Sequence, residues 1–301
     1  ASGTGPCWHV FMSNGSGFAT EPTLWSLPAG GKISANELGF SKIRGSGGAE
    51  GSETWELSDL NGDGRPDLIV TAQNTGGTFT GFSPDNGAYW KVYLNTGTGF
   101  SVVSVNWPLP VGGMIMSGNA LGFLSIFNTN YTGTTLTTGS DLWNLTDMDG
   151  DGLQDLTIFS EFDQALGQPI GFQPNAMSYW KVHLNTGSGF NGTYETWALP
   201  NGGGKATGVD LGYNAPFRQN FSASVGSENW SLVDINGDSK ADLVVTAARI
   251  AGGTDVVFSS NATKYWKVYL NTGSRFSNVE SPWTLPAGGL IDDGVDMGFI
   301  M

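Results

Sequence analysis

The chain has few of the residues on which several common protein classes depend. It holds one cysteine, two histidines and only 13 lysines and arginines in 301 residues, against 27 acidic residues. A single cysteine excludes an internal disulfide framework. A formal net charge of −14 argues against nucleic-acid binding, which needs a basic surface. No run of 18 apolar residues occurs, so we expect no membrane span.

The start of the chain bears on its location. It lacks a basic segment followed by an apolar stretch, so no signal peptide is expected to remain. The small residues at positions 1–3 are compatible with a mature chain after cleavage of a leader. We therefore expect a secreted, extracellular protein.

Tryptophan is abundant instead, and its spacing divides the chain into repeats. All eleven tryptophans fall into two sets. Members of the first set begin strand-like segments that end in an Asn-Gly, Asp-Gly or Asn-Thr-Gly turn, and they are Trp8, Trp55, Trp90, Trp143, Trp180, Trp230 and Trp266. The remaining four lie in W-x-L-P-x-G-G segments, and they are Trp25, Trp107, Trp197 and Trp283. Self-similarity at a period of 20–50 residues is typical of solenoids, propellers and repeat arrays.

Two kinds of repeat alternate. The first-type repeat reads W-x-L-x-D-x-N/D-G-D and continues into an apolar run, as at residues 55–72. The second-type repeat reads Y-W-K-V-Y/H-L-N-T-G, as at residues 89–97, and continues through G/R-F and W-x-L-P-x-G-G to a closing L/M-G-F/Y. Residues 7–15 are a degenerate second-type copy. The order is second, first, second, first, second, first, second.

These repeats predict an all-β fold. Alternating apolar residues give the period of two expected of strands, and 46 glycines separate them. Short strands with Gly-rich turns would also suit a sandwich or barrel. The sevenfold count favours a single seven-bladed β-propeller over residues 1–301, built from alternating pairs of repeats of about 43 residues. The predicted units are approximately 1–44, 45–85, 86–130, 131–172, 173–218, 219–260 and 261–301.

Three in-phase acidic loops predict metal sites in the first-type repeats. Each places oxygen donors at relative positions 1, 3, 5 and 9, with a backbone carbonyl at position 7, a pattern that suits Ca²⁺. The predicted ligands are Asp59, Asn61, Asp63, Arg65 and Asp67; Asp147, Asp149, Asp151, Leu153 and Asp155; and Asp234, Asn236, Asp238, Lys240 and Asp242. The alternative is that these Asx residues only cap tight turns. In the third loop Ser239 replaces the glycine that eases the turn.

The predicted calcium is structural, three ions in all, and no catalytic residue is assigned. Each loop joins two strands, and four or five protein oxygens leave little room for a substrate. His9 and His183 align with ordinary strand positions of the other repeats. Outside the metal loops, no carboxylate or histidine is identified that recurs through the repeats, so we do not expect an enzyme.

The three calcium loops, each followed by an apolar strand, and the Y-W-K-V-Y-L-N-T-G-x-G-F segments resemble FG-GAP/VCBS repeats. Such repeats occur in integrin α-subunit propellers, in fungal lectins of the Psathyrella velutina type and in propellers of bacterial Rhs, SpvB and Tc-toxin proteins. The resemblance implies a calcium-binding propeller over essentially the whole chain. It does not decide function, because the family includes sugar binders, protein-interaction domains and toxin parts.

Three function classes remain open. A multivalent carbohydrate-binding lectin is favoured, because the recurring aromatic, amide and glycine residues suit neutral polyols, although no sugar-contacting residue can be assigned. A protein-interaction or toxin-scaffold propeller from a larger protein is the alternative, and a polysaccharide-acting enzyme is the third. The paired glycines after L-P (Gly30-Gly31, Gly112-Gly113, Gly202-Gly203 and Gly288-Gly289) are the expected loops for ligand approach. The Y-W-K lysines are expected to pack over the sheet.

Overall fold

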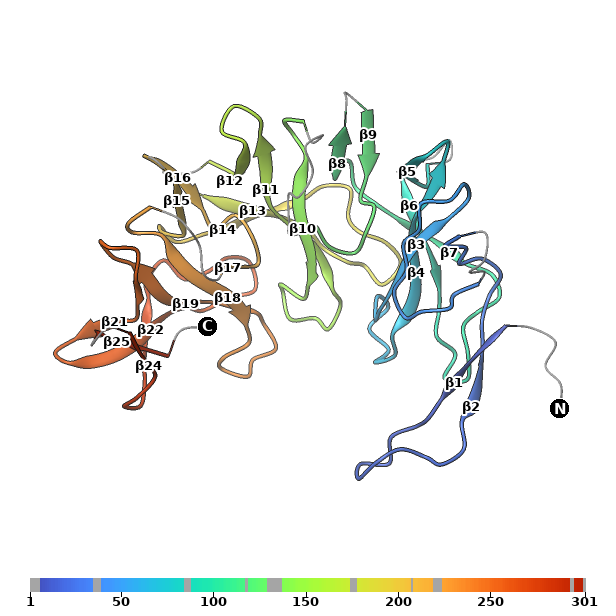
Figure 1. The fold of residues 1–301 in the computed structure, drawn as a ribbon, viewed down its shortest axis with the longest axis horizontal. Coiled ribbons are helices and arrows are strands. Elements are labelled where there is room, and N and C mark those ends of the chain that lie inside the picture. The colour runs from blue at the N-terminus through green and yellow to red at the C-terminus, as the bar shows by residue number, and fades with distance from the viewer. Residues whose placement is uncertain are drawn as a thin grey trace. The chain divides into compact units, whose positions relative to one another are not determined.

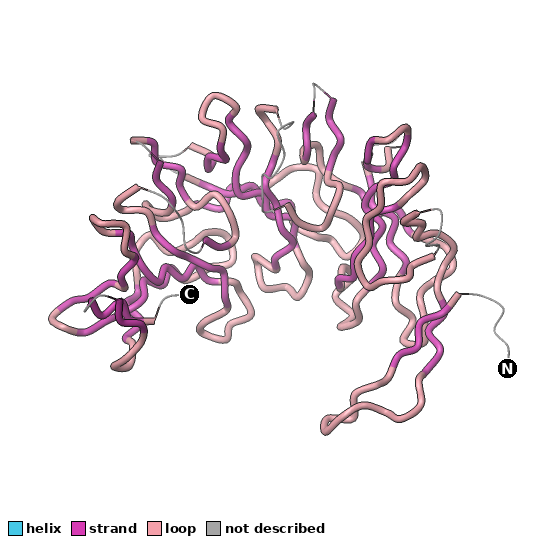
Figure 2. Tube along the Cα trace, in the orientation of Figure 1, coloured by secondary structure: helices cyan, strands magenta, loops and turns pink. Residues whose placement is uncertain are grey.

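The computed structural model describes residues 6–34, 39–83, 88–116, 119–128, 137–173, 178–206, 208–218, 224–292 and 295–299. Strands and loops make up all of these residues, and none of them is helical (Figure 2). The described residues therefore contain no helix that could cross a membrane. The chain divides into two compact bodies, which are considered separately. Body 1 comprises Ala1–Gly112, Ala120–Ile126 and Asn185–Gly192, and body 2 comprises Gly113–Asn119, Phe127–Leu184 and Thr193–Met301.

The strands are short and follow the repeats (Figure 1). The first nine are β1 (Cys7–Val10), β2 (Thr23–Ser26), β3 (Glu53–Ser58), β4 (Asp67–Thr75), β5 (Thr78–Gly81), β6 (Tyr89–Tyr93), β7 (Val105–Pro108), β8 (Met114–Met116) and β9 (Asn119–Gly122). The next eight are β10 (Asp141–Thr146), β11 (Asp155–Asp163), β12 (Gln168–Gly171), β13 (Tyr179–His183), β14 (Glu195–Ala198), β15 (Gly204–Ala206), β16 (Val209–Gly212) and β17 (Phe217–Arg218). The last eight are β18 (Glu228–Val233), β19 (Asp242–Arg249), β20 (Asp255–Val256), β21 (Phe258–Ser260), β22 (Thr263–Tyr269), β23 (Ser281–Thr284), β24 (Leu290–Asp292) and β25 (Val295–Gly298).

One antiparallel arrangement of four strands occurs three times. The strand orders are β3-β4-β6-β7 in body 1, and β10-β11-β13-β14 and β18-β19-β22-β23 in body 2. In each, the first two strands come from a first-type repeat and the last two from the second-type repeat that follows. The two hairpins join in the same register each time, with Leu68 opposite Tyr93, Leu156 opposite His183 and Leu243 opposite Tyr269. The hairpin β1-β2 forms a two-stranded sheet of its own.

The all-β class and the antiparallel pairing are confirmed, but seven blades are not. The tryptophan spacing predicts one blade for each repeat of about 43 residues, whereas the four-strand arrangement within each of these three sheets is built from two repeats. The physical reason is that a strand tryptophan marks the start of a hairpin. Its spacing counts hairpins and does not show which hairpins share hydrogen bonds within a sheet. The single-domain assignment and the unit boundaries stay predictions.

The closing L/M-G-F/Y motif accepts a hydrogen bond from the indole N–H of the strand tryptophan in its second-type repeat. Trp90 Nε1 donates to the carbonyl oxygen of Phe123 at 2.8 Å, Trp180 to Tyr213 at 2.7 Å, and Trp266 to Phe299 at 2.7 Å. The motif glycine Gly122 has a φ of 80°, and Gly212 and Gly298 adopt similar values, a conformation that glycine adopts without steric cost. Each second-type repeat thus folds back onto its own first strand.

A second aromatic contact links successive second-type repeats. The phenylalanine of the G/R-F step packs edge-on against the strand tryptophan of the preceding second-type repeat. The ring centroids lie 5.6 Å apart for Phe100 and Trp8, 5.7 Å for Phe190 and Trp90, and 5.4 Å for Phe276 and Trp180. These three phenylalanines are buried. The core of each body is therefore a series of interlocked tryptophans and phenylalanines.

Candidate metal centres

The three acidic loops connect the two strands of the first-type hairpins. In each, the ninth residue opens the second strand and faces the last residue of the first strand, as Asp67 faces Ser58. Glycines with positive φ shape the turns, for example Gly64 at 79° and Gly152 at 89°. Ser239 occupies the equivalent position in the third loop with a φ of 72°, so an ordinary side chain is held there in a conformation that favours glycine.

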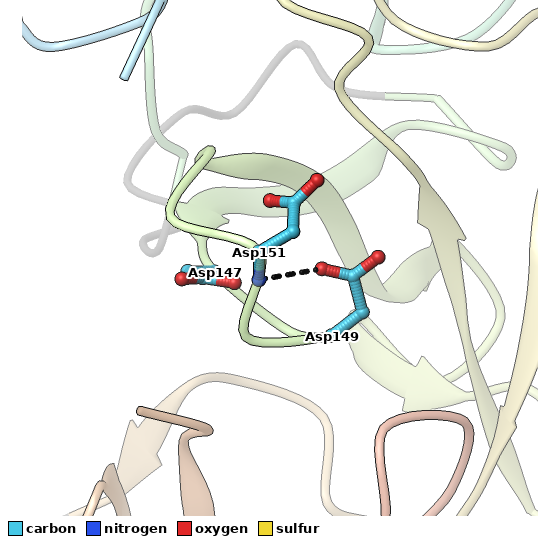
Figure 3. Close-up of side chains that lie close together, drawn as sticks. All are labelled: Asp147, Asp149 and Asp151. Atoms are coloured by element: carbon cyan, nitrogen blue, oxygen red, sulfur yellow. Dashed lines mark hydrogen bonds between the residues drawn. The ribbon is translucent and has the colours of Figure 1, made fainter. Parts of the chain in front are cut away.

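The second loop gathers three carboxylates at one point. Asp147, Asp149 and Asp151 each offer one oxygen, and these oxygens all lie within 4.8 Å of one another (Figure 3). Burial raises the pKa of Asp149, and the neighbouring charges of Asp151 and Asp147 add to the rise. Three carboxylate oxygens that lie close together and repel one another form a donor set that fits Ca²⁺. The first and third loops have Asn61 and Asn236 at the middle position, which supply a neutral oxygen instead.

Backbone N–H groups organise the same side chains. Asp59 accepts from the N–H groups of Gly62 and Gly64 at 2.9 and 2.8 Å. The first aspartate of the other two loops accepts the corresponding pair. At position 7, the N–H groups of Arg65, Leu153 and Lys240 donate to the position-5 aspartate at 2.9, 2.8 and 3.0 Å. These bonds are the turn-capping pattern, and the metal-ligand role of the position-7 carbonyls stays a prediction.

The ninth aspartates lie deeper than the others. Asp67, Asp155 and Asp242 are fully buried. One oxygen of each accepts the N–H of loop position 2, at 3.3, 2.9 and 3.3 Å respectively. Burial raises the pKa of Asp67 to about 6. Asp155 is not among the three carboxylates that converge in its loop. A ligand role for the three ninth aspartates stays a prediction, and their described contacts are with the backbone.

The asparagine of the N-T-G segment is part of this arrangement. The second oxygens of Asp67 and Asp242 accept the N–H groups of Asn95 and Asn271, both at 2.8 Å. Asn271 Nδ2 also donates to the carbonyl oxygens of Ala241 and Met148, and Asn185 Nδ2 donates to that of Leu60. The acidic loops are therefore hydrogen-bonded to the turns of second-type repeats.

A buried acid recurs in the first-type repeats and was not predicted from the sequence. Two residues before the first-type tryptophan stand Glu53, Asp141 and Glu228, all buried. Each accepts the N–H of the second glycine of a preceding P-x-G-G segment, from Gly31 at 2.6 Å, Gly113 at 2.7 Å and Gly203 at 2.7 Å. The expectation that no carboxylate recurs outside the metal loops is wrong. The position two residues before tryptophan in all three first-type repeats was the signal that could have revealed it.

The Y-W-K lysine faces this acid. Lys267 Nζ lies 3.3 Å from Glu228, and Lys91 Nζ lies 3.9 Å from Glu53. The charge of Lys181 lowers the pKa of Asp141 against the larger effect of burial. Each ammonium group also lies over a phenylalanine ring, 4.0 Å from Phe82, 3.9 Å from Phe172 and 4.1 Å from Phe258. The lysines therefore pack over the sheet, as the sequence analysis expected.

The paired glycines are close-packed. A Cβ atom on Gly31 would lie 2.5 Å from the backbone nitrogen of Phe40. One on Gly203 would lie 2.5 Å from the carbonyl of Gly212, and one on Gly289 would lie 2.2 Å from that of Gly298. The glycines are needed because the closing motif approaches this closely. At these positions the backbone of the same repeat fills the space that the sequence analysis offered to a ligand.

Comparison with known proteins identifies one of the repeats. Residues 57–88 match the FG-GAP repeat family, which confirms the resemblance seen in the sequence. No curated protein matches the chain significantly. Among solved structures, the chain is similar to one from the Photorhabdus luminescens Tc holotoxin pore, with a mutation in TccC3, at 14% identity and a TM-score of 0.29. The match covers 96% of this chain and 11% of that chain, so this chain spans about a tenth of its length.

Proposed function

We propose that this chain is a non-catalytic, calcium-stabilised β-propeller scaffold that binds protein partners. The observation that carries the proposal is the hydrogen bonding of the acidic loops to the N-T-G turns, because an ion held there would brace the joints between repeats. Loop position 9 reaches the turn directly, as in the bond from Asn95 to Asp67 at 2.8 Å. Bound calcium would neutralise the carboxylates of each loop, including the converging Asp147, Asp149 and Asp151 of the second.

The absence of catalysis is proposed because the recurring polar groups serve the architecture. Glu228 accepts from Gly203 and from the hydroxyl of Tyr213 at 3.0 Å, and it faces Lys267. A general acid or base must reach a substrate proton, whereas this carboxylate is buried among groups of the neighbouring repeats. The equivalent acids Glu53 and Asp141 accept the corresponding glycine N–H groups.

The case for a lectin loses its main support. It rested on recurring aromatic and glycine residues, but Trp90, Trp107, Trp180 and Trp197 are buried in the described structure. Gly31, Gly203 and Gly289 are packed against the closing motifs of their repeats. A protein-binding scaffold needs no repeated polar pocket, and FG-GAP repeats support such a role. An extracellular location, where calcium is abundant, is part of the proposal.

Two parallel measurements test the proposed function. The protein would be screened on a glycan array and, separately, cross-linked in an extract of its source and analysed by mass spectrometry, each with calcium and with EGTA. The proposal predicts reproducible protein cross-links that weaken in EGTA, and no glycan signal. A glycan hit that titrates with a stoichiometry above one per chain would contradict it in favour of a lectin, and turnover of a polysaccharide would contradict it in favour of an enzyme.

A further inference from the structure

The three acidic loops differ at two positions, and both differences change their charge. Position 3 is Asp149 in the second loop and an asparagine in the other two. Position 7 is Leu153 in the second loop, but Arg65 in the first and Lys240 in the third. The second loop therefore carries four carboxylates and no cation, a formal charge of −4. Each of the other loops carries three carboxylates and one cation, a formal charge of −2.

The cations at position 7 lie beside the carboxylate at position 5 of the same loop. Arg65 Nη1 lies 3.6 Å from Asp63 Oδ2. Lys240 Nζ lies 3.8 Å from Asp238 Oδ2, and it donates to the carbonyl oxygen of Asp238 at 3.5 Å. Position 5 is one of the predicted calcium ligands. In these two loops a resident positive charge therefore lies close to the place where an ion would bind, and it repels that ion.

The lysine is more confined than the arginine. The side chain of Arg65 is 54% exposed, whereas that of Lys240 is 26% exposed. The stem of Lys240 packs against the second loop and an N-T-G turn, because a Cβ atom on Gly150 would lie 2.8 Å from its Cγ, and one on Gly273 would lie 3.4 Å from its Cε. A charge that is held in place and partly shielded from water acts more strongly than a mobile, exposed one. Lys240 should therefore oppose an ion more than Arg65 does.

We propose that loop position 7 sets the order in which calcium binds, and that the second loop takes the first ion. Leu153 adds no positive charge to the loop whose three carboxylates converge (Figure 3). Calcium affinity in loop sites follows the charge of the ligands, and the first and third loops must bind an ion against their own arginine or lysine. This inference rests on the proposed function, because it concerns the same calcium loops. It makes two of the three ions responsive to a fall in calcium that leaves the ion of the second loop bound.

Calcium titration of the full chain tests the order of binding. Calorimetry gives the dissociation constants, and native mass spectrometry counts the bound ions at each calcium concentration. We expect one ion to bind about 100-fold more tightly than the other two, because an added carboxylate ligand and a missing cation each favour it by about tenfold. Asp149→Ala should abolish this tight step and leave the two weaker ions.

Exchanges at position 7 test the assigned residues. Lys240→Leu should tighten one weak ion about tenfold, and Arg65→Leu should tighten the other by less, about threefold. Leu153→Lys should weaken the tight ion about tenfold. Two controls should bind calcium as the wild type does: Lys240→Arg keeps the charge, and Lys42→Leu removes the same charge from an exposed position outside the loops.

The order of binding and the proposed function can fail separately. Three equal dissociation constants, a tight step that survives Asp149→Ala, or an unchanged titration for Lys240→Leu would each overturn the proposal. Those results would leave the calcium-stabilised scaffold standing, because ions would still bind. A chain that binds no calcium at any concentration would overturn this inference and the calcium-stabilised scaffold together.

Discussion

The side-chain carboxylate of Asp67 accepts the backbone N–H of Asn95 across 2.8 Å, and so joins an acidic loop to the N-T-G turn of the next repeat. Asp242 and Asn271 repeat the bond at the same distance. Because Asp67 is also the first residue of β4, the loop, the strand and the following turn are fixed together. Any ion that orders the loop should therefore stabilise more than the loop itself.

Burial of the Phe100 ring should be worth several kcal/mol. Phe100→Ala removes a buried ring whose centroid lies 5.6 Å from the indole, and large-to-small core substitutions of this kind cost about 3–5 kcal/mol. Phe18→Ala is the matched control, because Phe18 holds the same repeat position but is 73% exposed, and it should change stability by less than about 0.5 kcal/mol. Denaturant unfolding measures both, and similar losses for the two variants would contradict the assignment.

The buried acid Glu228 should stabilise the fold through the hydrogen bonds that it accepts. Glu228→Ala leaves the N–H of Gly203 and the hydroxyl of Tyr213 without this acceptor, and we expect a loss of about 3 kcal/mol. Glu228→Gln keeps an acceptor oxygen and should cost about 1 kcal/mol less. Glu21→Ala, at an exposed position, should be neutral within about 0.5 kcal/mol. A neutral Glu228→Ala variant would show that the acid is dispensable.

Stability should fall between about pH 4 and pH 6 because of Asp141. Burial raises the pKa of this carboxyl from 3.8 to about 6, against the opposing effects of Gly113 and Lys181, while Glu161 adds a smaller rise. A pKa raised by folding means that the folded state binds the proton more tightly. Its contribution is therefore complete below the unfolded pKa and is lost as pH rises through the folded value. The change is about 3 kcal/mol at most.

Asp141→Asn cannot ionise, so the difference in unfolding free energy between wild type and variant isolates this effect. Urea unfolding from pH 3.5 to pH 7.5 in EGTA should show the difference shifting in favour of the variant as pH rises. Parallel profiles for the two proteins would mean that Asp141 is not perturbed by its surroundings.

Glycine in place of Ser239 should relieve backbone strain in the third acidic loop. Ser239 has a φ of 72°, a conformation that costs an L-residue about 1–2 kcal/mol. Part of that gain is offset by the greater flexibility of glycine in the unfolded chain. Ser239→Gly should therefore stabilise by about 0.5–1 kcal/mol, and the reciprocal Gly152→Ser in the second loop should destabilise. If Ser239→Gly destabilises in thermal unfolding, the serine makes a contact that outweighs its strain.

Local patterns of the chain could be predicted from the sequence, and pairing between repeats could not. The alternation of residues around Trp90 predicted strand β6. The spacing of Asp147, Asp149 and Asp151 predicted the loop whose oxygens converge. Both depend on neighbours within nine residues. The pairing of β4 with β6 depends on hydrogen bonds between hairpins about 25 residues apart. No local signal encodes it, and for this reason tryptophan spacing does not fix the number of four-stranded blades.

The buried acids illustrate the same limit within the site. Glu53 and Glu228 are of a residue type that is usually found on the surface. Their burial depends on Gly31 and Gly203 of a preceding repeat, whose N–H groups donate to them. Asn95 was likewise read as a turn residue because its donor bond to Asp67 spans 28 residues. Burial and long-range bonding of polar groups are set by tertiary packing, which a single sequence shows only where a position recurs.

Calcium removal shows whether bound ions stabilise the fold. Thermal unfolding would be followed with calcium in excess and after EGTA, with bound ions counted by native mass spectrometry. We predict three ions per chain and a melting temperature that falls on chelation, since an ion at 100 times its dissociation constant stabilises the folded state by about 2.7 kcal/mol. Asp149→Ala should lose one ion, and Asp163→Asn, outside the loops, should keep all three. Melting that is unchanged by EGTA, with no ion bound in calcium, would contradict the account.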